Sequence, residues 1–111
     1  MTRPPPLPPP HLRDPGDAWV EGPNGKRYWG TFGAAGLLLL HPPLGVLLQL
    51  RAEWSHQGGT WGIPGGALKK GEDAVTAAIR ESQEEAGIPD GAARVIDHSV
   101  FDLGFWSYTT V

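Results

Sequence analysis

The sequence predicts one small domain of mixed α/β (α+β) class, in which a single helix packs on a sheet. Residues 74–86 repeat small and apolar side chains at helical spacing and carry clear start and stop signals. The segments around them are short, apolar or β-branched, and are separated by clusters of glycine and proline, as in strands joined by turns. A chain of 111 residues has room for one domain with a modest core.

The chain opens with a proline-rich segment. Residues 1–15 contain seven of the twelve prolines. Proline favours an extended, polyproline-type backbone, so we expect residues 1–16 to form a flexible tail and residues 17–111 to form the domain. A ligand for an SH3-like module is the alternative interpretation of the tail, although the sequence implies no partner for it.

Two strands and a turn are predicted at the start of the domain. Residues 19–21 and 26–29 flank the pair Asn24-Gly25, and this pair between apolar segments is a strong hairpin signal. We expect Trp19 and Trp29 to be packing residues, with stacking on a base as the alternative.

Three further segments before the helix resemble strands. The continuous apolar run 32–40 predicts a strand that is buried on both faces, and residues 46–51 predict a second one after a break at 41–45. A loop over 53–59, in which His56 is expected to be solvated, leads to a short strand over 60–64. Trp61 in that strand is predicted to pack in the core.

Two more strands are predicted after the helix. Residues 94–101 alternate apolar and polar side chains, and residues 105–111 are aromatic and β-branched.

The helix is defined by its ends. Asp73 is a suitable N-cap because its carboxylate can accept a hydrogen bond from an unpaired backbone N–H. Gly87 suits a left-handed cap, and Pro89 forbids continuation, so the helix should run from 74 to 86. Its apolar face is predicted to consist of Val75, Ala78, Ile79, Ser82 and Ala86.

Carboxylates crowd the last turns of this helix. Glu81, Glu84 and Glu85 stand at positions i, i+3 and i+4, where side chains are neighbours on one surface, which we expect to lie opposite the apolar face. Like charges at this spacing destabilise a helix by about 0.2–0.5 kcal/mol per pair, and anions are also unfavourable at its C-terminal end. A bound divalent cation such as Mg²⁺ would compensate them, and a solvated acidic face is the alternative.

The stretch from the preceding glycine pair to the end of the helix resembles the signature of the Nudix hydrolase family. That signature is G-x5-E-x7-R-E-U-x-E-E-x-G-U, where U is bulky and apolar. Ser82 stands at one U position, so we expect weaker packing of the helix but no loss of a ligand. The matching residues are Gly66, Glu72, Arg80, Glu81, Glu84, Glu85, Gly87 and Ile88.

The resemblance implies a fold and an activity. The fold is an α/β/α sandwich around a mixed sheet, which we expect to be incomplete at its C-terminal end because family domains usually continue through further strands and a second long helix. The activity is hydrolysis of a nucleoside diphosphate linked to another moiety, in which water attacks phosphorus with Mg²⁺ or Mn²⁺ as cofactor. The alternative is a Nudix-fold nucleotide-binding module, or a truncated fragment, with weak or no catalysis.

The resemblance also implies roles for individual residues. Glu81 is expected to hold or deprotonate a water, Glu72 to lie near the metals, and Arg80 to brace the loop and helix through ion pairs. The glycine pair is expected to turn tightly, so that a carbonyl oxygen can face the metal. The implied metal ligands are the carbonyl of Gly65 and the side chains of Glu81, Glu84 and Glu85.

Composition excludes several other classes. The absence of cysteine excludes disulfides and thiolate chemistry, and a formal net charge of −3 argues against binding of a nucleic acid polymer. The longest apolar stretch, residues 34–40, is far shorter than the roughly 20 residues that span a bilayer. With no secretory signal in residues 1–10, we expect a cytoplasmic protein. The resemblance implies that it acts on a small molecule, a nucleoside diphosphate derivative.

Overall fold

The computed structural model describes residues 14–50 and 59–111. Residues 1–13 of the predicted proline-rich tail, and His56, lie outside these residues. The elements, in chain order, are β1 (Trp19–Glu21), β2 (Arg27–Trp29), β3 (Ala34–Gly36), β4 (Leu40–His41), β5 (Gly45–Val46), β6 (Gln49–Leu50), β7 (Trp61–Gly62), β8 (Gly65–Ala67), α1 (Ala74–Ala86), β9 (Ser99–Asp102) and β10 (Ser107–Thr110).

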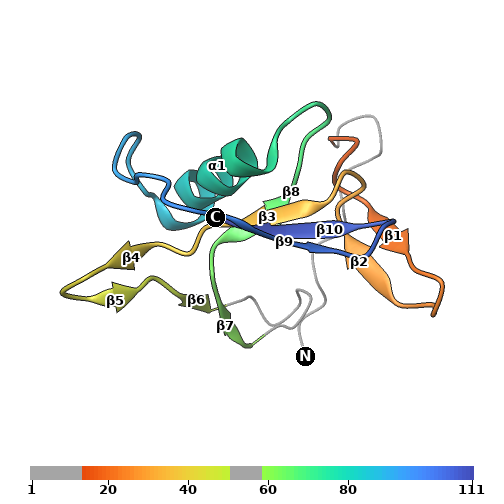
Figure 1. The fold of residues 1–111 in the computed structure, drawn as a ribbon, viewed down its shortest axis with the longest axis horizontal. Coiled ribbons are helices and arrows are strands. Elements are labelled where there is room, and N and C mark those ends of the chain that lie inside the picture. Colours follow the sequence, from red (N-terminus) through yellow and green to blue (C-terminus); the bar gives the residue numbers. More distant parts are fainter. Residues whose placement is uncertain (1–13, 51–58) are drawn as a thin grey trace.

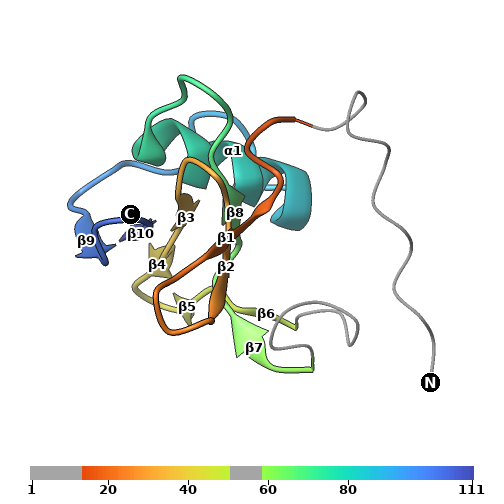
Figure 2. The ribbon, with the colours of Figure 1, turned by 90° about the vertical axis from the view of Figure 1, so that its right-hand side faces the viewer.

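The centre of the fold is a four-stranded mixed sheet with α1 packed across it (Figure 1). Its strand order is β8-β3-β10-β9, in which β3 runs parallel to β10 and antiparallel to β8. The pairs β1–β2, β4–β5 and β6–β7 form separate two-stranded ladders. The turned view in Figure 2 shows that α1 covers one side of this sheet and that the β6–β7 pair lies apart from the sheet. The predicted mixed α/β class is confirmed.

The ends of α1 agree with the prediction from sequence. The helix spans Ala74–Ala86, and Oδ1 of Asp73 accepts a hydrogen bond from the backbone N–H of Thr76 at 2.8 Å. At the other end Gly87 has φ 67°, and its N–H donates to the carbonyl of Gln83 at 3.1 Å. A left-handed cap of this kind strongly favours glycine.

The packed face of α1 consists of very small side chains. Ala77 and Ala78 are fully buried and pack with Ala35, Leu37 and Val111. Ala77 was not among the predicted apolar positions, whereas Val75, Ile79 and Ala86 are only half-buried.

Ser82 is fully buried, although the signature has a bulky residue at this position. Its hydroxyl donates to the carbonyl oxygen of Ile79 at 2.7 Å, so the buried polar group is satisfied within the helix.

The long apolar run is not one strand, and this prediction was wrong. Residues 33–37 are buried, but Phe32, Leu38 and Leu40 are 42%, 49% and 60% exposed. The sheet and α1 enclose the chain only around β3, and beyond it the chain leaves to form the β4–β5 hairpin seen at the left of Figure 1.

Other strand predictions were right in part. The β1–β2 hairpin forms as predicted, with Trp19 and Trp29 in edge-to-face contact at 5.1 Å between ring centroids. The segment 46–51 is divided between β5 and β6, and the segment 94–101 is a strand only from residue 99 onward. Trp61 in β7 is 64% exposed, so its predicted core position was wrong. The core cluster among the described residues gathers around α1 and β3 and does not include Trp61.

No helix in the described part of the chain is long and apolar enough to cross a membrane.

Removal of the N-cap tests the local account of the helix. Asp73→Ala should lower the free energy of unfolding by about 1 kcal/mol, because the N–H of Thr76 loses its acceptor. Urea unfolding at neutral pH measures the change. Asp73→Asn keeps an acceptor and should retain most of the stability, so equal losses in both variants would contradict the capping role.

Candidate active site

The glycine pair before the helix forms an extended edge strand, so the predicted tight turn was wrong. Gly65 and Gly66 lie in β8, paired with Gly36 and Ala35 of β3. The requirement for glycine is close approach: a Cβ on Gly65 would lie 2.6 Å from the carbonyl oxygen of Ala35. A Cβ on Gly66 would lie 2.6 Å from the carboxyl carbon of Glu81. Gly66 therefore provides the space in which Glu81 sits.

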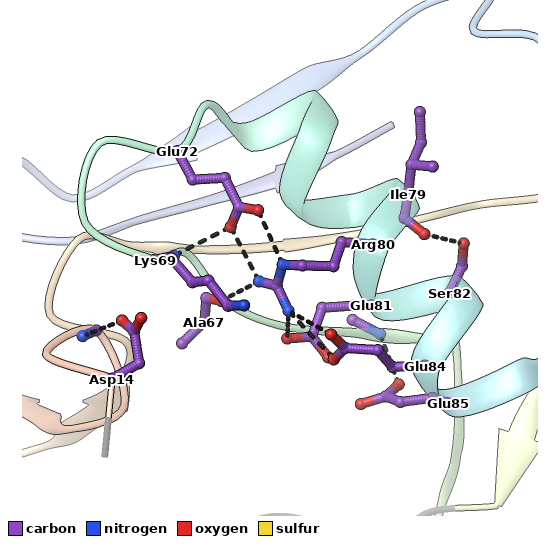
Figure 3. Close-up of polar contacts among 12 residues, drawn as sticks. Asp14, Ala67, Lys69, Glu72, Ile79, Arg80, Glu81, Ser82, Glu84 and Glu85 are labelled. Carbon is purple, nitrogen blue, oxygen red and sulfur yellow. Dashed lines mark hydrogen bonds and ion pairs between the residues drawn. The ribbon is translucent and has the colours of Figure 1, made fainter. Parts of the chain in front are cut away.

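Arg80 is the hub of the polar contacts in the site. Its Nε and Nη2 donate to the two oxygens of Glu72 at 2.8 and 2.9 Å, and Nη2 also donates to the carbonyl oxygen of Ala67 at 3.1 Å. Its Nη1 donates to Glu81 at 3.0 Å and to Glu84 at 3.2 Å. Figure 3 shows the guanidinium between Glu72 on one side and the other two glutamates on the opposite side. One arginine thus ties the helix to the loop before it and to β8.

Glu72 is held as a carboxylate. It accepts the forked pair from Arg80 and a further hydrogen bond from the backbone N–H of Lys69 at 3.0 Å. The hydrogen bonds from Arg80 are the main reason that the pKa of Glu72 lies below its usual value, because they favour the charged form.

The pKa of Glu81 is shifted in the opposite direction to that of Glu72. Its side chain is 15% exposed and lies against Gly66 on the sheet side of the helix. Burial raises the pKa of Glu81 to about 7, the contact with Arg80 opposes this, and the charges of Glu85 and Glu84 add to it. The sequence interpretation placed Glu81 opposite the packed face of the helix, and this was wrong, because its side chain turns toward β8.

Glu84 and Glu85 lie nearer solvent. The side chain of Glu84 is 54% exposed, and its contact with Arg80 is the longest of the three ion pairs. Oε2 of Glu85 accepts hydrogen bonds from the backbone N–H of Gly65 at 3.0 Å and from Nε2 of Gln49 at 2.7 Å. In an antiparallel strand the N–H and C=O of one residue point to the same side, so the carbonyl of Gly65 shares this edge of β8.

The structure therefore gathers all the residues that the sequence singled out. Arg80 contacts Glu72, Glu81 and Glu84, while Glu85 is anchored to Gly65 at the adjoining end of β8.

Two residues near the site were missed by the sequence interpretation. Gln49 reaches Glu85 from β6, 36 residues away in sequence. Asp17 lies in the turn before β1, and burial and the charge of Asp14 raise its pKa, whereas Arg80 lowers it. No motif marks either residue, because Gln49 contacts Glu85, and Asp17 comes within reach of the charge of Arg80, only once distant segments have folded together.

The acidic groups of the site outnumber its positive charge. In the part of the chain that the structure describes, no three His, Cys, Asp or Glu side chains converge closely enough to hold a metal ion. Arg80 instead draws Glu72, Glu81 and Glu84 toward its own nitrogens. The donors are nevertheless the hard oxygens that Mg²⁺ and Mn²⁺ prefer. Burial is the main cause of the raised pKa of Glu81, and a cation would relieve the repulsion from Glu85 and Glu84 that adds to it. The chemistry of these donors thus suits a divalent cation, although the side chains, held by Arg80, do not converge around one.

The fold and this site have the features of one known family. A model of the NUDIX domain matches residues 30–110, which include β3, β8, α1 and β10. The chain belongs to the Nudix family.

Relatives within the family are similar over most of this chain. A protein of Mycobacterium tuberculosis named putative 8-oxo-dGTP diphosphatase 3 is 51% identical over an alignment 110 residues long, which covers 90% of this chain and 51% of that protein. A nucleoside triphosphate pyrophosphatase/Nudix hydrolase fusion protein of Bifidobacterium longum is 47% identical over an alignment 107 residues long, which covers 91% of this chain and 22% of that protein. The chain thus spans about half or less of these relatives.

A solved structure has the same fold. The crystal structure of the Nudix hydrolase RenU from M. smegmatis superimposes with a TM-score of 0.74 at 48% sequence identity, covering 84% of this chain and 66% of that one. This similarity confirms the predicted fold class.

The raised pKa of Glu81 predicts a pH dependence of stability in metal-free buffer with a chelator. In the folded state the pKa of Glu81 lies above the usual carboxyl value of 4.5, so folding favours the protonated form. The contribution of Glu81 to stability is therefore complete below about pH 4.5 and is lost as the pH rises through about 7. The Glu81→Gln variant should not show this loss, so its melting temperature should change less over that pH range than that of the wild type.

Thermal unfolding of both proteins at a series of pH values measures the effect. The pKa of Glu72 is lowered, so its contribution to stability is lost on acidification, in the opposite direction to that of Glu81. This contribution is present in both proteins. Parallel curves for the wild type and the variant between pH 4.5 and 7 would contradict the burial of Glu81.

Proposed function

We propose that this chain is a hydrolase that cleaves a phosphoanhydride bond of a nucleoside diphosphate derivative, with Mg²⁺ or Mn²⁺ as cofactor. The observation that supports it most is the carboxyl of Glu81, which lies against Gly66 with a pKa raised to about 7. In the metal-free protein this pKa is near neutrality, where a base can both accept and release a proton. A carboxylate that served only as a solvated surface charge would not require this burial.

Glu81 is the proposed general base. It accepts a proton from a water whose oxygen forms a bond to phosphorus, while the bond from phosphorus to the bridging oxygen breaks and leaves two phosphate-bearing products. A divalent cation held by Gly65, Glu81, Glu84 and Glu85 would neutralise the charge of the diphosphate and stabilise the transition state.

Arg80 and Glu72 act as positioning residues in this proposal. The fork from Arg80 to Glu72 fixes the guanidinium, so its remaining nitrogen contacts the oxygens of Glu81 and Glu84. These contacts restrict the rotamers of the two glutamates, and a planar fork does this better than a lysine ammonium would.

The proposed substrate class is a nucleoside triphosphate or another nucleoside diphosphate derivative. The name of the M. tuberculosis relative, a putative 8-oxo-dGTP diphosphatase, makes that nucleotide the first to test. Nucleotides, ADP-ribose and dinucleotide cofactors should be incubated with the protein in Mg²⁺ and the products separated by chromatography. Binding by calorimetry without any product would favour the alternative, a nucleotide-binding module that has lost catalysis.

Removal of the two outer glutamates tests the cation ligands. Glu84→Gln combined with Glu85→Gln should lower turnover at least about 100-fold, because amides hold a divalent cation far less well than carboxylates do. Initial rates at fixed Mg²⁺ measure the loss, and circular dichroism reports whether the variant is folded. Glu21→Gln, at an exposed position in β1, is the matched control and should keep full activity. Full activity in the folded double variant would overturn the assignment of these ligands.

A further inference from the structure

Gln49, which lies outside the signature, contacts the acidic helix from a strand that is distant in sequence. Gln49 lies in β6, and its Nε2 donates to Oε2 of Glu85 at 2.7 Å. The β6–β7 ladder pairs Gln49 with Gly62, and the chain from there runs directly into Gly65 and β8. The position of Gln49 therefore follows from backbone pairing next to the site.

Both hydrogen bonds to Glu85 end on the same oxygen. Oε2 accepts the backbone N–H of Gly65 at 3.0 Å as well as the amide of Gln49. Among the described residues, no donor is bonded to Oε1. Two donors on one oxygen restrict the rotation of an otherwise exposed side chain and leave the second oxygen available to a ligand.

The chemistry of the donor matters because Gln49 is neutral. Arg80 holds Glu72, Glu81 and Glu84 through a positive charge, which offsets part of theirs. An amide orients Glu85 without offsetting its charge, so the carboxylate keeps its full attraction for a cation. A carboxylate near the C-terminal end of a helix, where anions are disfavoured, has little other reason to be held in place.

We propose that Gln49 is a positioning residue that orients Glu85 for a divalent cation. This inference rests on the proposed function, in which Glu85 is a metal ligand. A neutral donor from β6 thus extends the site beyond the signature residues.

Gln49→Met tests the proposal, since methionine has nearly the same length and no donor. The affinity for Mn²⁺ alone, measured without substrate by the electron paramagnetic resonance signal of the free ion, should fall about tenfold. Turnover should fall at low Mg²⁺ and recover at high Mg²⁺, because Gln49 acts through the cation and does not touch the substrate. A structural defect would not be reversed in this way.

The matched control is Gln83→Met, because Gln83 is a helix glutamine whose amide contacts Asp90 and none of the site residues. It should leave Mn²⁺ affinity unchanged, and melting in chelator compares the stability of the two variants. If the Gln49→Met variant does not fold, Gln49→Asn is tested instead, because its side chain is one methylene shorter and its amide lies farther from Glu85. Unchanged Mn²⁺ affinity in a folded Gln49 variant would overturn the inference.

The wild type separates this inference from the proposed function. Wild-type protein that binds Mn²⁺ through Glu85 but hydrolyses no nucleotide would overturn the proposed activity alone. Wild-type protein that binds no Mn²⁺ would overturn both.

Discussion

The close packing of α1 on β3 and β8 is the constraint on which the site depends. Ala77 and Ala78 are fully buried, and Gly66 leaves no space for even one additional carbon before the carboxyl of Glu81. Since no large side chain separates the helix from the strand, Glu81 is pressed against backbone and loses water. Burial is the main reason that its pKa rises to about 7, so a steric property of a glycine becomes a chemical property of a glutamate.

A single guanidinium then sets the charge balance around that carboxyl. Arg80 gives Glu72 two well-aligned hydrogen bonds and shares its remaining nitrogen between Glu81 and Glu84. Two glutamates that touch the same arginine therefore have pKa values displaced in opposite directions, one lowered by hydrogen bonds and one raised by burial. Separation of neighbouring carboxyl groups in this way is how one site can provide both a permanent anion and a proton acceptor.

Sequence patterns were reliable where the cause was local and failed where it was not. The cap residues Asp73 and Gly87 act on backbone groups within four positions, and both perform as their chemistry predicts. The apolar run 32–40 has the composition of a buried strand, but burial requires neighbours, and only residues 33–37 have α1, β8 and β10 around them. The prediction that Trp61 packs in the core was wrong for the same reason, because the hydrophobicity of a side chain does not determine whether neighbouring elements cover it.

The sequence by itself determined the bounds of the helix, the family and the signature residues of the site, because these are encoded in spacing along one continuous stretch. The tertiary structure decided what those residues can do. It made the glycine pair an edge strand, turned Glu81 toward that strand, and brought Gln49 from 36 residues away to Glu85. Exclusion of water and contacts between distant segments exist only once the chain has folded, so no pattern of residue types along the chain contains them.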